Sequence, residues 1–451
     1  MRSFIICLVA ACVVGFCAAG VQAEEWVIAP SGDRTGVLDA NAIEWALRAV
    51  ADAVADGEGP GTVRLEEGHF WVSRPIQVSG FDGELVGAAK KKKGKEKKGK
   101  KKRETIIEAV RGPGVEFGTI PGPYWRLTEH SPIFLFEDNE GSIRIADLTV
   151  QILIPNPRDT YLLHGSVETT SLYSFFEIVG GDDFDTAFEN VLTRGGEGDY
   201  NDRNVIYGVH VMGGSPDYNG AWSTGTHEVK KCKFENIATY TYSYSLWRDS
   251  DFVVEGSSFT GVDTAIFSQY NESTDVKISH NKFKTHPVVS TDTIIIDGDL
   301  SPFVSKILIS KNEFRVSGQA GAITVWDPGF FFYAQKTLDV SIIGNKFQLD
   351  EAYWGGIWTD LHGALIDGNE FKGTSFYGAV VAGINSLQGD LYLPAEGLYI
   401  ADNDFKKLSS VAHTIWLGKG TSECTVADNE GVGDYVRDEG KNNKVKLNKL
   451  N

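Results

Sequence analysis

The sequence contains little sulfur: its 451 residues include 5 cysteines and 2 methionines. Three of the cysteines, Cys7, Cys12 and Cys17, lie in an N-terminal apolar stretch, so only Cys232 and Cys424 remain beyond it. Two cysteines cannot form the disulfide framework that stabilises many small exported domains. The sequence therefore predicts a protein that is stabilised by its own hydrophobic core.

Basic residues are also few, with 43 Lys and Arg against 61 Asp and Glu and a net charge of −18. Because binding to a phosphate backbone requires a basic surface, this balance argues against nucleic acid as a partner. Eleven of the basic residues lie in one run, Lys90–Arg103. We interpret this run as a disordered surface insertion, with a contact to polyanions or to an anionic cell surface as the functional alternative.

Long apolar runs are absent after residue 23. The one long run, Phe4 to Ala19, follows Arg2 and precedes Val21-Gln22-Ala23, whose small residues suit a signal peptidase site. This pattern predicts a signal peptide over residues 1–23. No later run reaches the length of a membrane span, so we expect no transmembrane anchor and an exported protein located outside the cell, in the periplasm or at the cell surface.

A repeat with Asn and Phe at fixed positions runs through the second half of the sequence. Its clear copies are VKISHNKF, ILISKNEF, VSIIGNKF, ALIDGNEF and LYIADNDF. Alternating apolar residues without an intervening amphipathic helix indicate one coil of strands per repeat, and stacked coils share a continuous core. We expect the Asn residues to occupy a bend and to form an internal ladder, with a Phe ladder beside it. Cys232 and Cys424 occupy inward positions in distant coils, which predicts two buried free thiols.

A helix is predicted near Asn41 to Ala55, because apolar residues recur there at helical spacing. Asp39 is its expected N-cap. Such a helix would cover the open end of a coil stack.

This helix, the following GTVRL (Gly61 to Leu65) and GHF (Gly68 to Phe70) motifs, and the Asn-x-Phe coils resemble the right-handed parallel β-helix proteins of the pectate-lyase-like superfamily. The resemblance implies an all-β right-handed parallel β-helix, or solenoid, with an N-terminal capping helix. It divides the chain into a cap with first coils (24–139), further coils (140–432) and a basic C-terminal tail (433–451). It does not specify a function, because the superfamily includes lyases, hydrolases, epimerases and tailspikes.

Three coils are longer than the others, and their extra residues begin near Asp297, Asp327 and Asn385. Loops at one phase of a solenoid form the wall of a groove. The repeat also places an Asp or Asn of successive coils at nearly one phase, with aromatic residues beside them. The predicted catalytic residues are Asp297, Asp327, Asp360 and His362, and the predicted substrate-binding residues are Trp326, Trp354, Trp358 and Asn385.

The chemistry expected of this groove is acid–base catalysis on sugars. Carboxylates one or two coils apart would be ~5 or ~10 Å apart, which brackets the separations found in glycosidases. Like charges at such distances raise the pKa of one carboxyl group, as a general acid requires. In the alternative interpretation each residue stabilises its own turn, as the tripeptide Asp327-Pro328-Gly329 suggests.

A second acidic cluster, Asp182, Asp183 and Asp185, is a candidate Ca²⁺ site, with an acidic surface loop as the alternative. The sequence lacks the G-H-G and N-T-D elements of polygalacturonases and the Trp-x-Asp-His and Arg-x-Pro-x-x-Arg elements of pectate lyases. The sequence therefore predicts an exported β-helix protein that acts on polysaccharide as a glycoside hydrolase or a polysaccharide lyase. The alternative is a non-catalytic glycan-binding or cell-surface structural protein.

Overall fold

The computed structural model describes most of the chain beyond residue 24. The described residues are 25–88, 104–110, 131–153, 173–196, 205–213, 223–237, 240–245, 247–269, 271, 273–285, 292–297, 304–318, 321–326, 338–384, 394–410, 413–431, 436–446 and 448. The predicted signal peptide and the Lys90–Arg103 run lie outside these residues.

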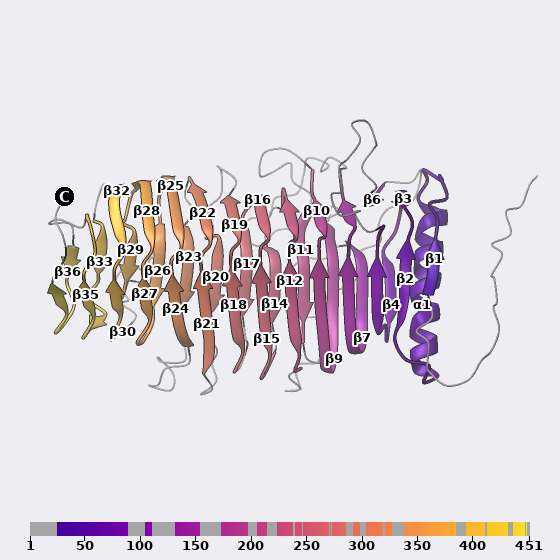
Figure 1. Cartoon of the computed structure of the whole chain (residues 1–451), viewed down its shortest axis with the longest axis horizontal. Coiled ribbons are helices and arrows are strands. Elements are labelled where there is room, and N and C mark those ends of the chain that lie inside the picture. Colours follow the sequence, from indigo (N-terminus) through magenta and orange to yellow (C-terminus); the bar gives the residue numbers. More distant parts are fainter. Residues whose placement is uncertain are drawn as a thin grey trace, which may run out of the picture.

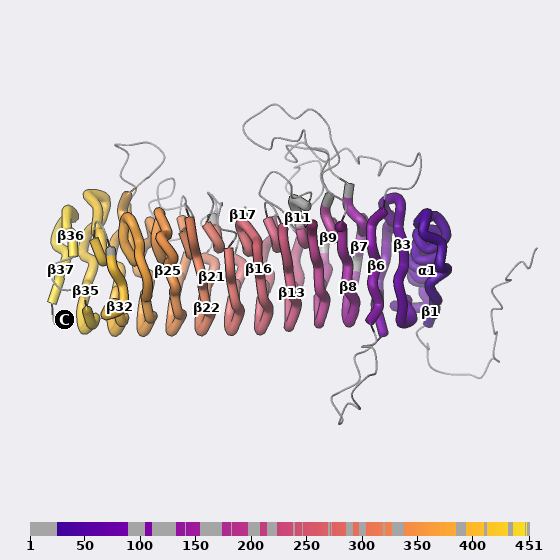
Figure 2. Tube along the Cα trace, turned by 90° about the horizontal axis from the view of Figure 1, so that it is seen from above, coloured from indigo at the N-terminus to yellow at the C-terminus, as the bar shows by residue number. Residues whose placement is uncertain are grey.

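The chain is a right-handed parallel β-helix, in which most coils contribute one strand to each of three faces (Figure 1). The strands of neighbouring coils pair in parallel along the whole stack. Seen from above, the coils follow one another in sequence order from the N-terminal helix to the C-terminal strands (Figure 2). The fold class predicted from the sequence is confirmed.

Face 1 and face 3 belong to one large sheet, because the long strands β7 (Ser131–Ala146) and β9 (Tyr173–Glu189) run through both. Face 1 otherwise consists of β1 (Glu25–Ile28), β2 (Gly61–Leu65), β5 (Gly83–Val86), β12 (Thr226–Lys230), β15 (Asp251–Glu255), β18 (Asp275–Ser279), β21 (Ser305–Ser310), β24 (Leu338–Ile343), β27 (Leu365–Asp367), β31 (Tyr399–Ala401), β35 (Thr425–Ala427) and β37 (Lys444–Lys446). Face 3 otherwise consists of β4 (Ile76–Ser79), β11 (Val205–Met212), β14 (Tyr240–Ser245), β17 (Thr264–Gln269), β20 (Ile294–Asp297), β23 (Gly321–Trp326), β26 (Gly355–Asp360), β29 (Val380–Ala382), β33 (Ile415–Leu417) and β36 (Val436–Asp438).

Face 2 is a separate 11-stranded sheet. Its strands are β3 (Gly68–Val72), β6 (Thr105–Ala109), β8 (Thr149–Gln151), β10 (Leu192–Arg194), β13 (Lys233–Glu235), β16 (Ser258–Val262), β19 (Lys282–Thr285), β22 (Glu313–Ser317), β25 (Lys346–Ala352), β28 (Glu370–Ser375) and β32 (Asp404–Ser410). A short additional pair, β30 (Ala395–Glu396) and β34 (Thr421–Ser422), extends the C-terminal coils.

The predicted Asn ladder is present and buried. Asn345 Oδ1 accepts hydrogen bonds from the backbone N–H and the side-chain amide of Asn312, both at 3.0 Å, and Asn345 Nδ2 donates to Ile309 O at 2.9 Å. The same pattern recurs in the neighbouring coils. The bend, however, is made by the residue before each Asn, such as Lys311 with φ 55° or Asp402 with φ 52°. The Asn therefore stabilises the turn by hydrogen bonding and does not supply its left-handed geometry.

The Phe ladder is confirmed as well. Successive rings from Phe234 to Phe405 stack with centroids 4.5–4.9 Å apart, close to the strand spacing. Each ring is at most 2% exposed. Both ladders are therefore structural.

The capping helix α1 (Val37–Ala55) begins earlier than the sequence pattern predicts. Asp39 is not its N-cap: it lies in the first turn, and its carboxylate accepts the backbone N–H groups of Ser31 and Trp71, each at 2.8 Å. The N-cap residue is Gly36, and Asp33 accepts the backbone N–H of Leu38 instead. Tertiary contacts to β3 thus decide the role of Asp39. No helix in the described part of the chain is long and apolar enough to cross a membrane.

The coil stack extends further than residue 432. Strands β36 and β37 pair with β33 and β35, within the segment predicted to be a basic tail. Asn448 accepts the backbone N–H of Asn429 at 3.1 Å and so continues the Asn ladder. The predicted boundary is too early because these last coils carry the Asn without the Phe that marks the repeat.

The two described cysteines are free and fully buried, as predicted. Burial raises the pKa of the Cys232 thiol to about 12 and also raises that of Cys424. We expect a chain beginning at Glu24 to react with no thiol reagent at pH 8 while folded, and with two equivalents after denaturation. Rapid modification of either thiol in the native protein would contradict the burial described here.

Candidate functional site

The outward side of face 3 carries the candidate site. Its strands alternate between core residues, such as Ile323 and Ile357, and residues that point away from the core. Strand pairing aligns the outward residues of successive coils in one column. From β9 to β33 this outward column consists of Glu177, His210, Ser243, Phe267, Ile295, Thr324, Trp358, Val381 and Trp416.

Asp360 lies two residues after Trp358 on β26 and therefore points to the same side. Its side chain is only 6% exposed, and its Oδ1 has no hydrogen-bond partner among the described residues. Burial raises the pKa of Asp360 to about 8, although the backbone N–H groups of Gly383 and Ile384 act in the opposite direction. At neutral pH this carboxyl group is therefore mainly protonated and can donate a proton.

Aromatic rings surround the column next to Asp360. Trp354 packs edge-on against Trp358 with centroids 5.2 Å apart and stacks on Tyr377 at 5.2 Å. Tyr377 in turn stacks on Trp416 at 6.3 Å, and the Arg437 guanidinium lies 4.6 Å from the centre of the Trp416 ring. Such rings present flat apolar faces with polar edges, which suits contact with sugar rings.

A second carboxyl group with a raised pKa, half-buried and missed by the sequence analysis, lies in the preceding coils. Asp292 accepts the backbone N–H of Gly321 at 2.7 Å and the hydroxyl of Thr324, the outward-column neighbour of Trp358. Burial raises the pKa of Asp292, partly opposed by these two hydrogen bonds. A Cβ at position 321 would be 2.4 Å from Asp292 Oδ1 and 3.4 Å from the Trp354 Cβ, so glycine is what admits the carboxyl group here. Asp292 thus positions the strand that carries Thr324.

The predicted carboxylates are brought together only in part. The pairing register aligns Asp297, Trp326 and Asp360, so Trp326 and not Asp327 shares the position of the other two. The cause is that the coil from Phe347 to Asp360 is one residue longer than the coil from Phe314 to Trp326. Asp327 itself lies outside the described residues, and of Asp297 only the backbone is described.

The predicted aromatic residues gather on this side of face 3. Trp354 and Trp358 are in contact, and Trp326, which is 39% exposed, lies in the Asp360 position of the preceding coil. Trp358 Nε1 donates to Ile384 O at 2.9 Å. Asn385 is outside the described part of the chain.

His362 lies close to Asp360 in sequence but leaves the face 3 strand. It is 6% exposed, and its backbone forms an isolated bridge with Glu396 of the next coil. The predicted catalytic role of His362 remains a prediction.

The N-terminal part of the outward column holds a polar pair that the sequence analysis also missed. Glu177 on β9 and His210 on β11 are register partners and are 0% and 7% exposed. Ser174 Oγ donates to Glu177 Oε1 at 2.6 Å. The signal that could have identified them is a single ionisable residue within an apolar strand, in YSFFEIV and YGVHVM.

The predicted Ca²⁺ cluster lies where β9 leaves face 3 for face 1. Asp185 Oδ1 accepts the backbone N–H of Thr226 at 2.6 Å, and Asp183 Oδ1 accepts the Thr224 hydroxyl at 3.5 Å. Within the residues described, no group of three or more His, Cys, Asp or Glu side chains could hold a metal ion. The side chain of Asp182 is outside that description, so the Ca²⁺ site stays a prediction.

Comparison with protein-family models gives no match, and comparison with curated proteins gives none. Solved structures with a similar fold include the A-module of the mannuronan C-5 epimerase AlgE6 from Azotobacter vinelandii. Its sequence identity is 13%, the match covers 90% of this chain and 95% of that one, and the TM-score is 0.43. Another is the catalytic unit of a GH87 α-1,3-glucanase from Streptomyces thermodiastaticus, with 14% identity, coverage of 96% and 71%, and a TM-score of 0.46.

A third similar structure is the tailspike protein gp49 of the Acinetobacter baumannii bacteriophage Fri1, a capsular polysaccharide depolymerase. Its identity is 13%, its coverage is 89% of this chain and 62% of that one, and its TM-score is 0.41. Likeness at this level concerns the fold and does not extend to a particular activity.

Proposed function

We propose that the protein is an enzyme that hydrolyses glycosidic bonds of a polysaccharide, with Asp360 as the general acid. One observation carries this proposal: a buried carboxyl group, whose pKa burial raises to about 8, lies on an outward strand face beside a cluster of tryptophan side chains. A carboxyl group that serves only a turn would be expected to be solvated or fully hydrogen-bonded.

In the proposed reaction Asp360 donates its proton to the glycosidic oxygen as the bond to the anomeric carbon breaks. A water molecule adds to that carbon and gives its proton to a base, so each cycle consumes one water and returns Asp360 to the protonated form by exchange. We assign the base to Asp297, whose backbone position lies in line with Asp360 two strand spacings away, ~10 Å. We propose an inverting mechanism, in which the two carboxyl groups are about 6.5–9.5 Å apart, because the backbone positions of Asp297 and Asp360 are two strand spacings apart.

The aromatic cluster provides the sugar-binding surface in this proposal. Trp326, Trp358 and Trp416 lie on successive or nearly successive coils, so a chain laid along the solenoid axis would meet one ring after another. The apolar run at residues 4–19 is consistent with export to the location of such a substrate.

The alternative function is non-catalytic glycan binding, which the same aromatic surface would support. A panel of purified polysaccharides separates the two when new reducing ends and ultraviolet absorbance of unsaturated ends are both measured. The proposal predicts new reducing ends without unsaturated ends on at least one substrate, and their absence with Asp360→Asn. Unsaturated ends would identify a lyase, and binding without either product would support the glycan-binding alternative; both results contradict the proposed hydrolysis.

A further inference from the structure

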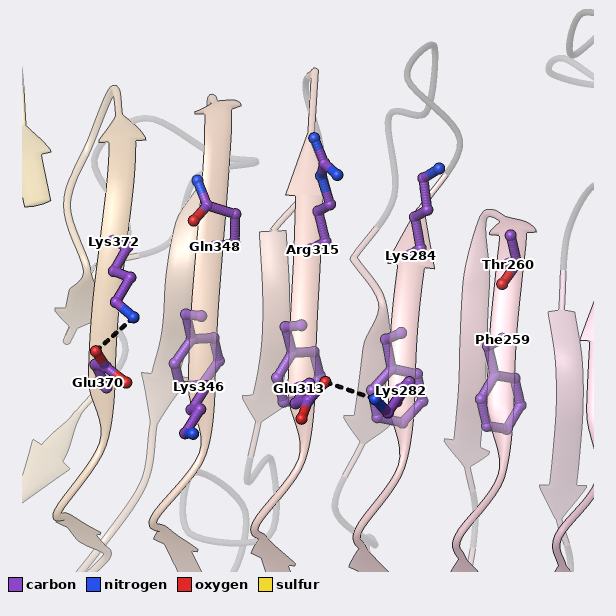
Figure 3. Close-up of a pocket in the computed structure, with 13 residues that line it drawn as sticks. Phe259, Thr260, Lys282, Lys284, Glu313, Arg315, Lys346, Gln348, Glu370 and Lys372 are labelled. Carbon is purple, nitrogen blue, oxygen red and sulfur yellow. Dashed lines mark ion pairs between the residues drawn. The ribbon is translucent and has the colours of Figure 1, made fainter. Parts of the chain in front are cut away.

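A row of hydrogen-bond donors follows the outward side of face 2, away from the candidate active site. Strand pairing aligns one outward residue from each of β19, β22, β25, β28 and β32. This donor row consists of Lys284, Arg315, Gln348, Lys372 and Lys407. Figure 3 shows the first four on neighbouring strands: Lys284, Arg315 and Gln348 extend the same way, whereas the Lys372 side chain turns towards Glu370. The register positions of the row hold no carboxylate, but Asp350 beside it accepts from Arg315 at 2.7 Å and from Gln348 at 2.8 Å.

A second outward row lies beside the donor row and alternates in charge. Lys282 forms an ion pair with Glu313 at 3.1 Å, and Glu370 forms one with Lys372 at 2.6 Å (Figure 3). Together the two rows line a shallow groove of about 340 Å³. Five cationic side chains border it, against two carboxylates: Lys282, Lys284, Arg315, Lys346 and Lys372, with Glu313 and Glu370.

The donor row is electrostatically unusual for this protein, which carries a net charge of −18. Like charges placed directly opposite on neighbouring strands are destabilising. Lys284 and Arg315 are such partners, as are Lys372 and Lys407. Neutralisation within the protein is partial: Arg315 pairs with Asp350 at 2.7 Å and Lys372 with Glu370 at 2.6 Å, and these two basic side chains remain 62% and 37% exposed. A ligand that supplies negative charge along the row would remove the repulsion.

We propose that the donor row is a binding site for an acidic polysaccharide that lies along the solenoid axis. The donors repeat at the strand spacing of ~4.8 Å in a single file, so they match a linear chain that bears an anionic group on each of several successive units. Lys and Arg bind carboxylates through charge-assisted hydrogen bonds. Gln348, whose amide already donates to Asp350 at 2.8 Å, has a second amide hydrogen that adds a neutral donor.

Single-stranded nucleic acid is the other linear polyanion to consider, and the groove does not fit it. Base stacking on exposed aromatic rings supplies much of the affinity in such complexes. The four aromatic residues that line this groove belong to the Phe ladder and are at most 2% exposed. The donor row therefore offers charge without a stacking surface.

This site goes beyond the proposed hydrolysis and does not depend on it. Face 2 is a different sheet from the one that carries Asp360. The test therefore measures binding and not turnover, and a negative result would not affect the proposed hydrolytic activity.

The test compares two triple variants that remove the same net charge from different faces. Lys284→Gln/Arg315→Gln/Lys372→Gln alters the donor row, and Lys230→Gln/Lys277→Gln/Lys306→Gln alters three basic residues of face 1. Both retain Lys90–Arg103, so any contribution of that run is equal in the two proteins. Affinity for carboxymethyl-dextran, with uncharged dextran as the matched neutral polymer, is measured at several salt concentrations, together with the melting temperature.

We expect the donor-row variant to bind carboxymethyl-dextran at least about tenfold more weakly, because three exposed charge contacts are lost. Its affinity should also depend less steeply on salt. The face 1 variant should bind within about twofold of the unmodified protein. Equal losses in both variants, no loss in either, or equally tight binding of an oligothymidine with the same dependence on the donor row would overturn the proposal.

Discussion

Asp360→Asn is expected to lower kcat by about 10²–10⁴-fold, which is the usual contribution of a general acid. The substitution keeps the shape of the side chain and an oxygen that can accept the backbone N–H groups, but it removes the transferable proton. Substrate affinity should change little, because the tryptophan cluster is untouched. The matched control is Asp275→Asn on face 1, where the side chain is half exposed and remote from the outward column; this variant should keep full activity.

The same substitution should change how stability depends on pH. Burial raises the pKa of Asp360 from an ordinary value of 3.8 to about 8, so the folded protein holds a proton that the unfolded chain releases. The stabilisation that the Asp360 proton provides is therefore fully present below about pH 4. It decreases as the pH rises and is lost above about pH 8. At about 1.4 kcal/mol for each pKa unit, the loss is on the order of 5 kcal/mol.

Asp360→Asn removes this dependence because the amide does not ionise. The difference in the free energy of unfolding between pH 5 and pH 9 should shrink by several kcal/mol, with the variant more stable than the unmodified protein at pH 9. Urea denaturation at the two pH values measures this difference. An unchanged pH dependence would mean that the Asp360 carboxyl group is ionised in the folded protein at neutral pH.

The second large effect is expected at the centre of the Asn ladder. Asn345→Ala deprives the backbone N–H and the side-chain amide of Asn312 of their shared acceptor and removes the donor to Ile309 O. Because these groups are buried, water cannot replace the lost partner, and each unsatisfied group costs about 1–3 kcal/mol. We expect the free energy of unfolding to fall by roughly 3–6 kcal/mol.

Two variants calibrate this effect. Asn345→Ser should cost less, because Ser257 at the equivalent position accepts the backbone N–H of Cys232 through its hydroxyl at 3.0 Å. Asn448→Ala, at the partly exposed end of the ladder, should cost about 1 kcal/mol or less, since water can take over its hydrogen bonds. Equal losses of unfolding free energy at positions 345 and 448 would show that the ladder Asn residues contribute through their turn propensity alone and not through buried hydrogen bonds.

The repetitive part of the fold could be predicted because each coil buries the same residue types at the same positions. The spacing of the Asn and Phe residues sufficed to place both ladders, to predict the β-helix and to assign Cys232 and Cys424 as buried free thiols. The spacing does not place residues correctly where a coil differs in length from its neighbours. One additional residue between Phe347 and Asp360 is enough to bring Trp326, and not Asp327, into register with Asp360.

The site could be located from the sequence only in outline, because the burial and hydrogen bonding of its carboxyl groups depend on contacts with neighbouring coils. The pKa of Asp360 depends on its burial and on the backbone of Gly383 and Ile384, which belong to the following coil. Asp292 is fixed by Gly321 and Thr324 one coil later. Glu177 and His210 lie in coils that lack the Asn-x-Phe signature altogether, so no phase could be assigned to them.

Infrared spectroscopy of the carboxyl C=O stretch measures directly whether Asp360 is protonated in the folded protein at neutral pH. A pH titration of the unmodified protein, compared with Asp360→Asn, isolates the band of this one group. We predict a protonated-carboxyl band that is present at pH 6, disappears with a midpoint near pH 8, and is absent from the variant. Difference spectra with no such band between pH 6 and pH 9 would show that Asp360 is ionised there and would contradict its role as the general acid.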